Sequence, residues 1–152
     1  MSLGLTNNQA SSLSYPITAV ARATSALPQT AALILFTVAG GRVELINITG
    51  QVTANIGGVA NDTQLLLGAT ALCANLNITG DTVGIRYSIT GTFANAMVET
   101  AVDVPVAEQA TRVVLPPGNI VLDCDGSDGG AGRVRWTLVY QPLEPGAYVV
   151  AA

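Results

Sequence analysis

The sequence contains no histidine and no lysine, and this absence excludes several common kinds of active site. A Ser-His-Asp or Cys-His nucleophile has no imidazole to act as its base. Zinc sites need histidines or cysteine pairs, and a phosphate-binding loop of the Walker type needs a lysine. Carboxylates remain, and a glycoside hydrolase works with two of them facing each other, but no pair here is marked by spacing or setting. We therefore expect that the protein is not an enzyme.

Charged side chains are also scarce. They make up 11% of the 152 residues, against about 25% in an ordinary soluble domain, and the mean hydropathy is +0.47. A single subunit of this composition would expose much weakly hydrated surface. This favours a component of an assembly, in which neighbouring subunits cover that surface. The alternative is a neutral surface, rich in threonine and asparagine, that is hydrated without help from charge.

The few charges are acidic in balance, with a net charge of −4 and an isoelectric point near 4.4. Binding to nucleic acid needs clustered cations that neutralise phosphates. Arg133 and Arg135 form the only close basic pair, and alternate residues of a strand are more typical of a solvated or subunit-pairing face. We expect no nucleic-acid partner.

Signals for export, for membrane insertion and for a disulfide are weak or missing. Residues 1–7 lack the basic start and apolar core of a secretory signal, and the most apolar run, residues 31–39, is too short to span a bilayer as a helix. We expect no membrane partner.

Two cysteines are compatible with a reduced compartment. Alternation places Cys124 in the core and Cys73 in a half-exposed position, which leaves their pairing open.

The clearest structural signal lies between Val43 and Ile56, where apolar and polar residues alternate strictly from Ile46 onward. Such alternation places all apolar side chains on one face of a β-strand and all polar ones on the other. Because this strand is long, we expect a bend at Gly50. The apolar set is Ile46, Ile48, Gly50, Val52, Ala54 and Ile56.

Weaker alternation predicts eight or nine strands in all and no long amphipathic helix. Residues 94–99 are expected to form a short helical segment or a loop, and Gly40-Gly41, Gly80-Asp81 and Pro116 to Asn119 are expected to form turns. The further predicted strands are residues 32–38, 64–70, 72–78, 83–93, 101–106, 111–115, 120–124 and 133–141. The strand over 32–38 is apolar on both sides, so we expect it to be buried on both faces or to lie at an interface. The tail is expected to wrap the surface or to form an edge strand at 148–150.

Together these patterns predict an all-β fold, an antiparallel β-sandwich with jelly-roll-like topology, over residues 27–152. Residues 1–26 are rich in serine, threonine, asparagine and alanine and have no sustained periodicity. We expect them to form an extended N-terminal arm that a neighbouring subunit holds in place.

An acidic, glycine-rich segment from Asp123 to Gly130 is the best local candidate for a metal site. Carboxylates on a glycine loop suit calcium, and Asp123, Asp125 and Asp128 are weak candidates for its ligands. The calcium-loop pattern fails, however, because Asp128 stands where glycine is required and Val134 where a bidentate glutamate belongs. We therefore favour an acidic hairpin loop and expect neither a metal nor a cofactor.

The aromatic residues Trp136, Tyr140 and Tyr87 have two interpretations. Exposed on one surface, they would make a platform for carbohydrate. All three fall in the apolar sets of their strands, however, so we expect them to pack in the core.

Two segments near the ends of the predicted sandwich carry structural motifs. These are Leu-Pro-Gln-Thr from Leu27, Gly-Gly-Arg-Val from Gly40, Arg-Trp-Thr-Leu from Arg135, Pro-Leu from Pro142 and Pro-Gly-Ala from Pro145. The chain thereby resembles the small virion structural proteins of tailed bacteriophages, and in layout it is similar to capsid decoration (cement) proteins.

This resemblance implies a β-sandwich, often a homotrimer, that sits on the capsid exterior and contacts the major capsid protein. It implies a virion component assembled in the host cytoplasm, without catalytic residues. An arm reaching neighbouring subunits would use its apolar residues. The candidates are Leu3, Leu5, Leu13, Tyr15 and Ile17. The alternative function is a receptor- or glycan-binding module of a phage tail or head fibre.

Overall fold

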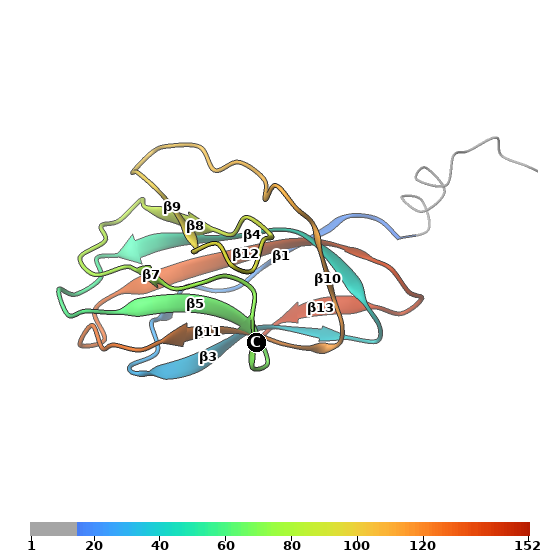
Figure 1. Ribbon diagram of the computed structural model, residues 1–152, viewed down its shortest axis with the longest axis horizontal. Coiled ribbons are helices and arrows are strands. Elements are labelled where there is room, and N and C mark those ends of the chain that lie inside the picture. Colours follow the sequence, from blue (N-terminus) through green and yellow to red (C-terminus); the bar gives the residue numbers. More distant parts are fainter. Residues whose placement is uncertain (1–14) are drawn as a thin grey trace, which may run out of the picture.

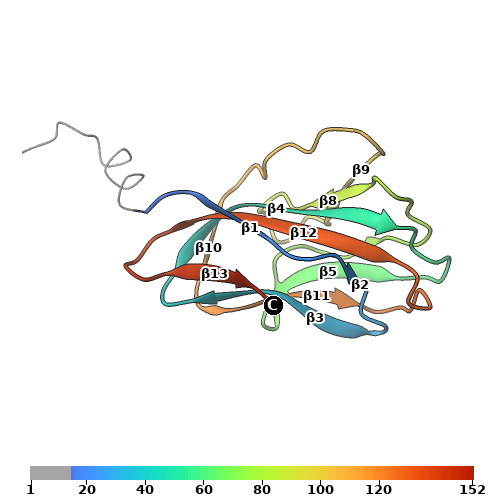
Figure 2. The same ribbon diagram turned by 180° about the vertical axis from the view of Figure 1, so that it is seen from behind.

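The structure, a computed structural model, describes residues 15–152, and in that range it contains β-strands and no helix. The strands form two antiparallel sheets stacked face to face (Figure 1 and Figure 2). The predicted all-β class is therefore confirmed, and the two stacked sheets agree with a β-sandwich.

Sheet A is the upper layer in Figure 1. It consists of β1 (Thr18–Ala21), β2 (Ser25–Ala26), β4 (Val43–Ala54), β8 (Arg86–Ser88), β9 (Val98–Thr100), β10 (Val113–Leu115) and β12 (Arg133–Pro142). Its main order is β1-β12-β4-β8-β9, with β10 paired to β4 and β2 paired to β12.

Sheet B is the lower layer in Figure 1. It consists of β3 (Ala31–Ala39), β5 (Asp62–Leu67), β6 (Thr70–Ala71), β7 (Leu76–Asn77), β11 (Gly118–Cys124) and β13 (Tyr148–Ala151). Its main order is β13-β3-β11-β5-β6, with β7 paired to β5.

Strand β4 lies at the centre of sheet A, as its alternation predicts. Ile48 and Val52 are fully buried, whereas Thr49 and Gln51 between them are half-buried on the other face. The register with β12 shifts opposite Val139 and Tyr140, so that β4 has one extra residue there. Such a bulge disrupts the regular alternation of side chains between the two faces.

Gly50 of β4 is needed because the ring of Trp136 occupies the space below it. A Cβ atom at Gly50 would lie 2.9 Å from the ring of Trp136 on β12. The Trp136 ring stacks on that of Tyr87, with ring centroids 6.3 Å apart and an interplanar angle of 28°. Both rings are buried and belong to the core between the sheets, which also includes Leu35 and Leu122 of sheet B.

The N-terminal boundary differs from the expected one. Strands β1 and β2 pair with β12, so residues 18–21 and 25–26 belong to sheet A, although we expected an arm up to residue 26. Short runs such as Thr18–Ala21 carry too little alternation to be distinguished from a coil by sequence alone. The remaining part of the predicted arm, residues 1–14, lies outside the described residues.

The strand predicted over residues 83–93 is mostly wrong. Only β8 forms there, because Gly84 and Gly91 adopt positive φ angles of 97° and 85° and turn the chain. At Gly91 a side chain is also excluded, since a Cβ atom would lie 1.8 Å from the carbonyl oxygen of Thr111. As a result Val83 and Phe93, which the alternation places in the apolar set of the predicted strand, are 52% and 49% exposed.

Three further expectations need correction, and one is confirmed. The strand expected over residues 101–106 is absent; this stretch belongs to a long connection that runs above sheet A in Figure 1. Within the expected helical segment or loop over residues 94–99, residues 94–97 form a loop, but residues 98 and 99 belong to β9. The expected strand over residues 72–78 is reduced to the two residues of β7. The edge strand expected at 148–150 is confirmed as β13.

Both cysteines are buried and free, so the half-exposed position expected for Cys73 is wrong. Its thiol accepts a hydrogen bond from the amide of Leu65 on β5 at 3.3 Å. Cys124 accepts one from the Thr63 hydroxyl, also at 3.3 Å. Burial raises the pKa of Cys73, and it raises that of Cys124 to about 11. Buried thiols of this kind are chemically inert at neutral pH.

Among residues 15–152, the structure has no helix that is both long enough and apolar enough to cross a lipid bilayer.

Candidate functional site

The outer face of sheet A carries two arginines with a glutamine between them. Arg135 on β12 is the register partner of Gln51 on β4, and Gln51 is the register partner of Arg86 on β8. Register partners project from the same side of a sheet. Arg135 Nη2 donates to Gln51 Oε1 at 2.9 Å, and Arg86 Nη1 donates to the carbonyl oxygen of Val104 at 3.0 Å. Strands β12, β4 and β8 thus place Arg135, Gln51 and Arg86 in one row on the outer surface of sheet A. We call these three residues the basic row.

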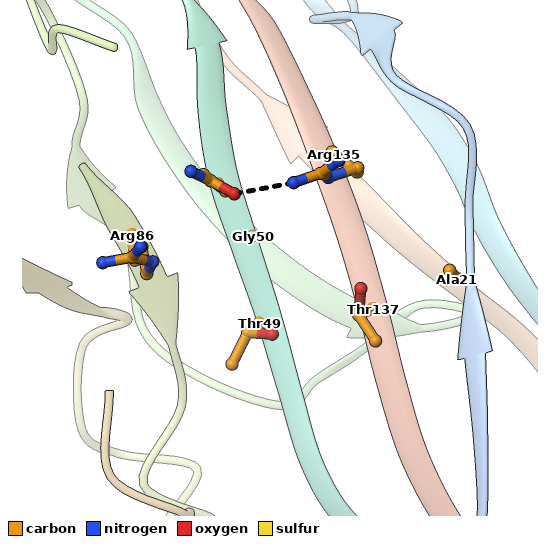
Figure 3. Close-up of a pocket in the computed structure, with 7 residues that line it drawn as sticks. Ala21, Thr49, Gly50, Arg86, Arg135 and Thr137 are labelled. Atoms are coloured by element: carbon orange, nitrogen blue, oxygen red, sulfur yellow. Dashed lines mark hydrogen bonds between the residues drawn. The ribbon is translucent and has the colours of Figure 1, made fainter. Parts of the chain in front are cut away.

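A row of hydroxyl groups lies beside this basic row. Thr137, Thr49 and Ser88 occupy the next outward-facing positions of the same three strands and are register partners in turn. Between the rows the surface is hollowed into a depression of about 250 Å³. Figure 3 shows Arg86 and Arg135 on either side of β4, with Thr49 and Thr137 below them. The lining residues are Ala21, Thr49, Gly50, Gln51, Arg86, Arg135 and Thr137.

A second depression, of about 290 Å³, lies between β8, β9 and the connection over residues 105–110. Gln109 closes one side of it and is buried. Its Nε2 donates to the carbonyl oxygens of Leu45 at 3.3 Å and Thr111 at 2.8 Å, which ties the connection to β4. The residue therefore explains how a segment without strands is held over sheet A.

The outer face of sheet B carries an apolar row, which lies beside a row that contains Asp123 and Gln64. Ile34 on β3 is the register partner of Val121 on β11, and Val121 is the register partner of Leu66 on β5. These three form an apolar row on the outer side of the sheet, in which Ile34 is 41% exposed, Leu66 is half-buried and Val121 is 8% exposed. Tyr148 and Val150 on the edge strand β13 extend this surface and are 48% and 45% exposed. We call these five residues the apolar B face.

The acidic loop, the glycine-rich segment from Asp123 to Gly130, is held together by hydrogen bonds to the carboxylate of Asp128. Asp128 is buried, and its carboxylate accepts hydrogen bonds from Gln29 Nε2 at 2.6 Å, from the amide of Gly130 at 2.9 Å and from the amide of Gly132. Burial raises the pKa of Asp128, but these hydrogen bonds together lower it below its ordinary value. The Asp128 side chain thus holds the loop in its conformation through hydrogen bonds to backbone amides of the loop and to Gln29.

The other two metal candidates point elsewhere. Asp125 Oδ1 accepts a hydrogen bond from the amide of Asp62 at 2.6 Å, and Asp123 stands on β11 opposite Ala32 and Gln64. In the described part of the chain, no group of three or more acidic, cysteine or histidine side chains is placed to hold a metal ion. The structure therefore gives Asp128 and Asp125 roles in hydrogen bonding the loop.

The three aromatic candidates lie in the core, as expected. Trp136 and Tyr87 are 1% exposed and Tyr140 is 5% exposed, so they form no platform on the surface.

Two acidic side chains near Tyr87 have raised pKa values. Burial raises the pKa of Asp81, and the hydrogen bond that its carboxylate accepts from the Tyr87 hydroxyl opposes this rise only in part. Burial and then the charge of Asp81 raise the pKa of Glu99. Burial, the hydrogen bond to Asp81 and nearby negative charges likewise raise that of Tyr87. Neither depression described above is lined by Asp81 or Glu99, so these carboxylates do not face a cleft there.

Of the five arm candidates, Leu3, Leu5 and Leu13 lie outside the described residues. The carbonyl oxygen of Tyr15 accepts a hydrogen bond from Gln141 Nε2 at 3.1 Å. Ile17 is 53% exposed just before β1.

Sequence reasoning missed the basic row on sheet A, whereas for sheet B it predicted that the strand over residues 32–38 is buried on both faces or lies at an interface. Alternation places Arg135, Arg86 and Gln51 in the polar sets of their strands, but it does not reveal that β4 lies between β12 and β8. The apolar B face had a visible signal, since Ile34 and Val121 interrupt the alternation of apolar and polar residues in their strands. That pattern is typical of a strand with two apolar faces.

Comparisons with known proteins found no match: no family model, no curated protein sequence and no solved structure is significantly similar to this chain.

Proposed function

We propose that the protein is a structural subunit of a bacteriophage virion, a capsid decoration or cement protein that associates with its own copies through the apolar B face. The observation that carries this proposal is the row formed by Ile34, Val121 and Leu66 on the outer side of sheet B. An antiparallel sheet that faces water normally presents polar residues there. The exposed apolar side chains of this face are Ile34, Tyr148 and Val150, and such a group typically marks a contact with another protein.

The scarcity of charge supports the same proposal. With charged residues at 11%, few side chains oppose close contact between neutral surfaces. Only two ion pairs form within residues 15–152, one between Arg42 and Glu144 and one between Arg112 and Glu44, and neither pair includes a residue of the apolar B face. Association of copies would therefore desolvate few charges, which keeps the cost of burial low.

The finer parts of the proposal are a homotrimer on the capsid exterior, contacts to the major capsid protein, and jelly-roll-like wrapping of the chain. Wrapping of this kind is supported by the way in which the longer strands alternate between the sheets. From β3 to β5 the chain passes from sheet B to sheet A and back, and from β11 to β13 it does so again. A shell protein of this type acts mechanically, since symmetry multiplies many small contacts.

The test is the molar mass of the full chain in solution, measured by light scattering over a wide range of concentration. We expect a mass above the 15.5 kDa of one chain that falls on dilution. Replacing Ile34 by aspartate buries a charge in the contact, so Ile34→Asp should remain a monomer at all concentrations. Val83→Asp is the matched control, because Val83 is similarly exposed (52%) but lies in a loop away from sheet B. A native chain that stays monomeric throughout would contradict the proposal.

A second test concerns location and the predicted arm. In intact particles, the protein should be found on the head and in a copy number that follows the shell symmetry. Deleting residues 2–14, which leaves β1 and the rest of sheet A intact, should preserve the fold and abolish binding to the shell. Unchanged binding of the shortened chain would remove the arm from the proposal.

A further inference from the structure

On the outer face of sheet A, on the side of the molecule opposite the apolar B face, Arg86 and Arg135 flank Gln51. Neighbouring strands lie about 4.8 Å apart, so the Cα atoms of the two arginines, two strands apart, are separated by about 10 Å. Each guanidinium extends far enough from its Cα to approach the space between them. The two cations therefore stand on either side of one narrow depression on sheet A (Figure 3).

Neither arginine is neutralised by the protein. Within residues 15–152, no carboxylate oxygen lies within 4.0 Å of Arg86 or Arg135, in contrast to Arg42 and Arg112, which pair with glutamates. The lining of the depression likewise contains no acidic residue. In a chain with a net charge of −4, this is a local concentration of unpaired positive charge. Two like charges at this separation repel each other, and an anion between them would turn repulsion into attraction.

Hydrogen-bond donors remain available on the same groups. A guanidinium has five N–H donors, and each of these two uses one in a hydrogen bond to the protein, Arg135 to Gln51 and Arg86 to Val104. The hydroxyl groups of Thr49 and Thr137 add donors on the neighbouring row. This donor set, with two forked cations and two hydroxyl groups, is the kind that recognises the oxygens of carboxylates, sulfates and phosphates.

The floor of the depression is rigid and its size is small. Gly50 contributes only backbone to the floor, and the buried Trp136 ring packs directly beneath it. The volume of about 250 Å³ lies below the range of about 300–1,000 Å³ that is usual for sites binding drug-sized molecules. A ligand of a few heavy atoms fits this volume.

We infer that the depression formed by Arg86, Gln51, Arg135, Thr49 and Thr137 is a binding site for a small oxyanion. The oxyanion is either a free tetrahedral ion such as phosphate or sulfate, or a carboxylate group. The site goes beyond the proposed assembly role: it lies on sheet A, whereas the proposed contact lies on sheet B, and each can fail without the other.

The test is a titration of the full chain followed by two-dimensional ¹H–¹⁵N NMR. Sodium phosphate, sodium sulfate and sodium acetate are added in separate series, with sodium chloride holding the ionic strength constant. We expect saturable shifts at the backbone amides of Gln51, Arg86 and Arg135 and at the Nε–H groups of both arginines. Saturation by phosphate and sulfate identifies a tetrahedral ion as the ligand, and saturation by acetate alone identifies a carboxylate group.

Variants of the arginines test whether the anion binds in this depression. Each arginine contributes charge-assisted hydrogen bonds, so Arg135→Gln alone should weaken binding about tenfold, and Arg86→Gln with Arg135→Gln should abolish saturation. Arg133→Gln is the matched control: it changes an exposed arginine of the same strand, outside the lining, and should leave the affinity within about twofold. The single variant Arg135→Gln keeps the test valid if the double variant unfolds.

Three results would overturn the inference. The first is the absence of a saturable response to any of the three anions. The second is an unchanged affinity in Arg135→Gln. The third is an equal loss in Arg133→Gln, which would mean a diffuse response to net charge and no defined site.

Discussion

The two outer faces of this sandwich differ in chemistry although they cover the same core. On sheet A the central outward positions hold Thr49, Gln51 and Arg135, which suit water and ions. On sheet B the corresponding central positions hold Ile34 and Val121, whose apolar side chains form no hydrogen bonds with water or ions. Both sheets bury their inward side chains almost completely, so the core does not account for the difference.

The difference shows which part of the sequence carries structural information and which part carries functional information. Inward positions must be apolar for the two sheets to pack, whatever the protein does. Outward positions are free of that requirement, because water accepts either polar groups or scattered apolar ones. A continuous apolar row on an outer face is therefore informative, and so is a pair of unneutralised arginines. These two features are the basis of the two proposals, which place subunit contact on sheet B and ion binding on sheet A.

The largest expected effect comes from the core that both faces share. Trp136 is 1% exposed, its ring stacks on Tyr87, and it fills the space below Gly50. Trp136→Ala should lower the free energy of unfolding by about 3–5 kcal/mol, because it removes buried apolar surface and leaves a cavity. Chemical denaturation measures this change. Both the association through sheet B and the ion binding on sheet A should be weakened together.

The control for this prediction is an aromatic residue on the surface. Phe93 is 49% exposed, so Phe93→Ala should change the free energy of unfolding by no more than about 0.5 kcal/mol. Equal losses in the two variants would show that Trp136 is not the centre of the core.

A smaller effect is expected at the acidic loop, which belongs to neither face. Asp128→Asn replaces one carboxylate oxygen by a donor, and a donor cannot accept the hydrogen bond from the amide of Gly132. The loss should be about 1.5–3 kcal/mol at pH 7, measured by denaturation. Because the pKa of Asp128 is lowered in the fold, its contribution is present above the ordinary pKa and is lost as the pH falls through the folded value. The native chain and Asp128→Asn should therefore converge in stability in acid.

Asp103→Asn is the matched control for this pH series, since Asp103 lies exposed in the connection over sheet A. It should follow the native curve at every pH. A constant gap between Asp128→Asn and the native chain down to the most acidic pH would contradict the assignment.

The smallest expected effect is at Asp81, beside the core of sheet A. Here the substitution by asparagine should leave stability unchanged or raise it, whereas Asp128→Asn should lower it. Burial raises the pKa of Asp81, so the folded state binds a proton more readily than the unfolded state does. Stability then falls as the pH rises from the ordinary pKa of an aspartate to the raised folded value. Asp81→Asn keeps an acceptor for the Tyr87 hydroxyl without the charge. It should equal or exceed native stability at pH 7, by less than about 1 kcal/mol, and should flatten the dependence between pH 4 and 7.

Thermal denaturation at several pH values measures this difference. A marked loss of stability in Asp81→Asn at neutral pH would mean that the charged hydrogen bond outweighs the cost of burying the carboxylate.

The sequence predicts much of this fold because alternation is a local signal. The bounds of β4, β11, β12 and β13 follow closely from it. The segment around Gly84 and Gly91 was mispredicted, because its apolar alternation suggested a strand while positive φ angles at two glycines bend the chain. Glycine is compatible with strands and turns alike, so the sequence does not distinguish these cases.

The candidate site depends on strand order, and this limits what the sequence can predict. Arg86 and Arg135 are 49 positions apart in the sequence and become neighbours only because β4 pairs with both β8 and β12. No local pattern encodes that pairing. Ile34 and Val121 were visible as departures from alternation, but their alignment into one row again follows from the register of β3 with β11.

Side-chain footprinting by hydroxyl radicals compares two matched aromatic residues and tests the central claim directly. Tyr148 on the apolar B face and Phe93 in a loop away from it are 48% and 49% exposed in the single subunit. Labelling is measured on concentrated and on highly diluted protein. The account predicts that concentration protects Tyr148 strongly and leaves Phe93 unchanged. Protection of Phe93 with Tyr148 still fully labelled would place the contact elsewhere and contradict the division between the two faces.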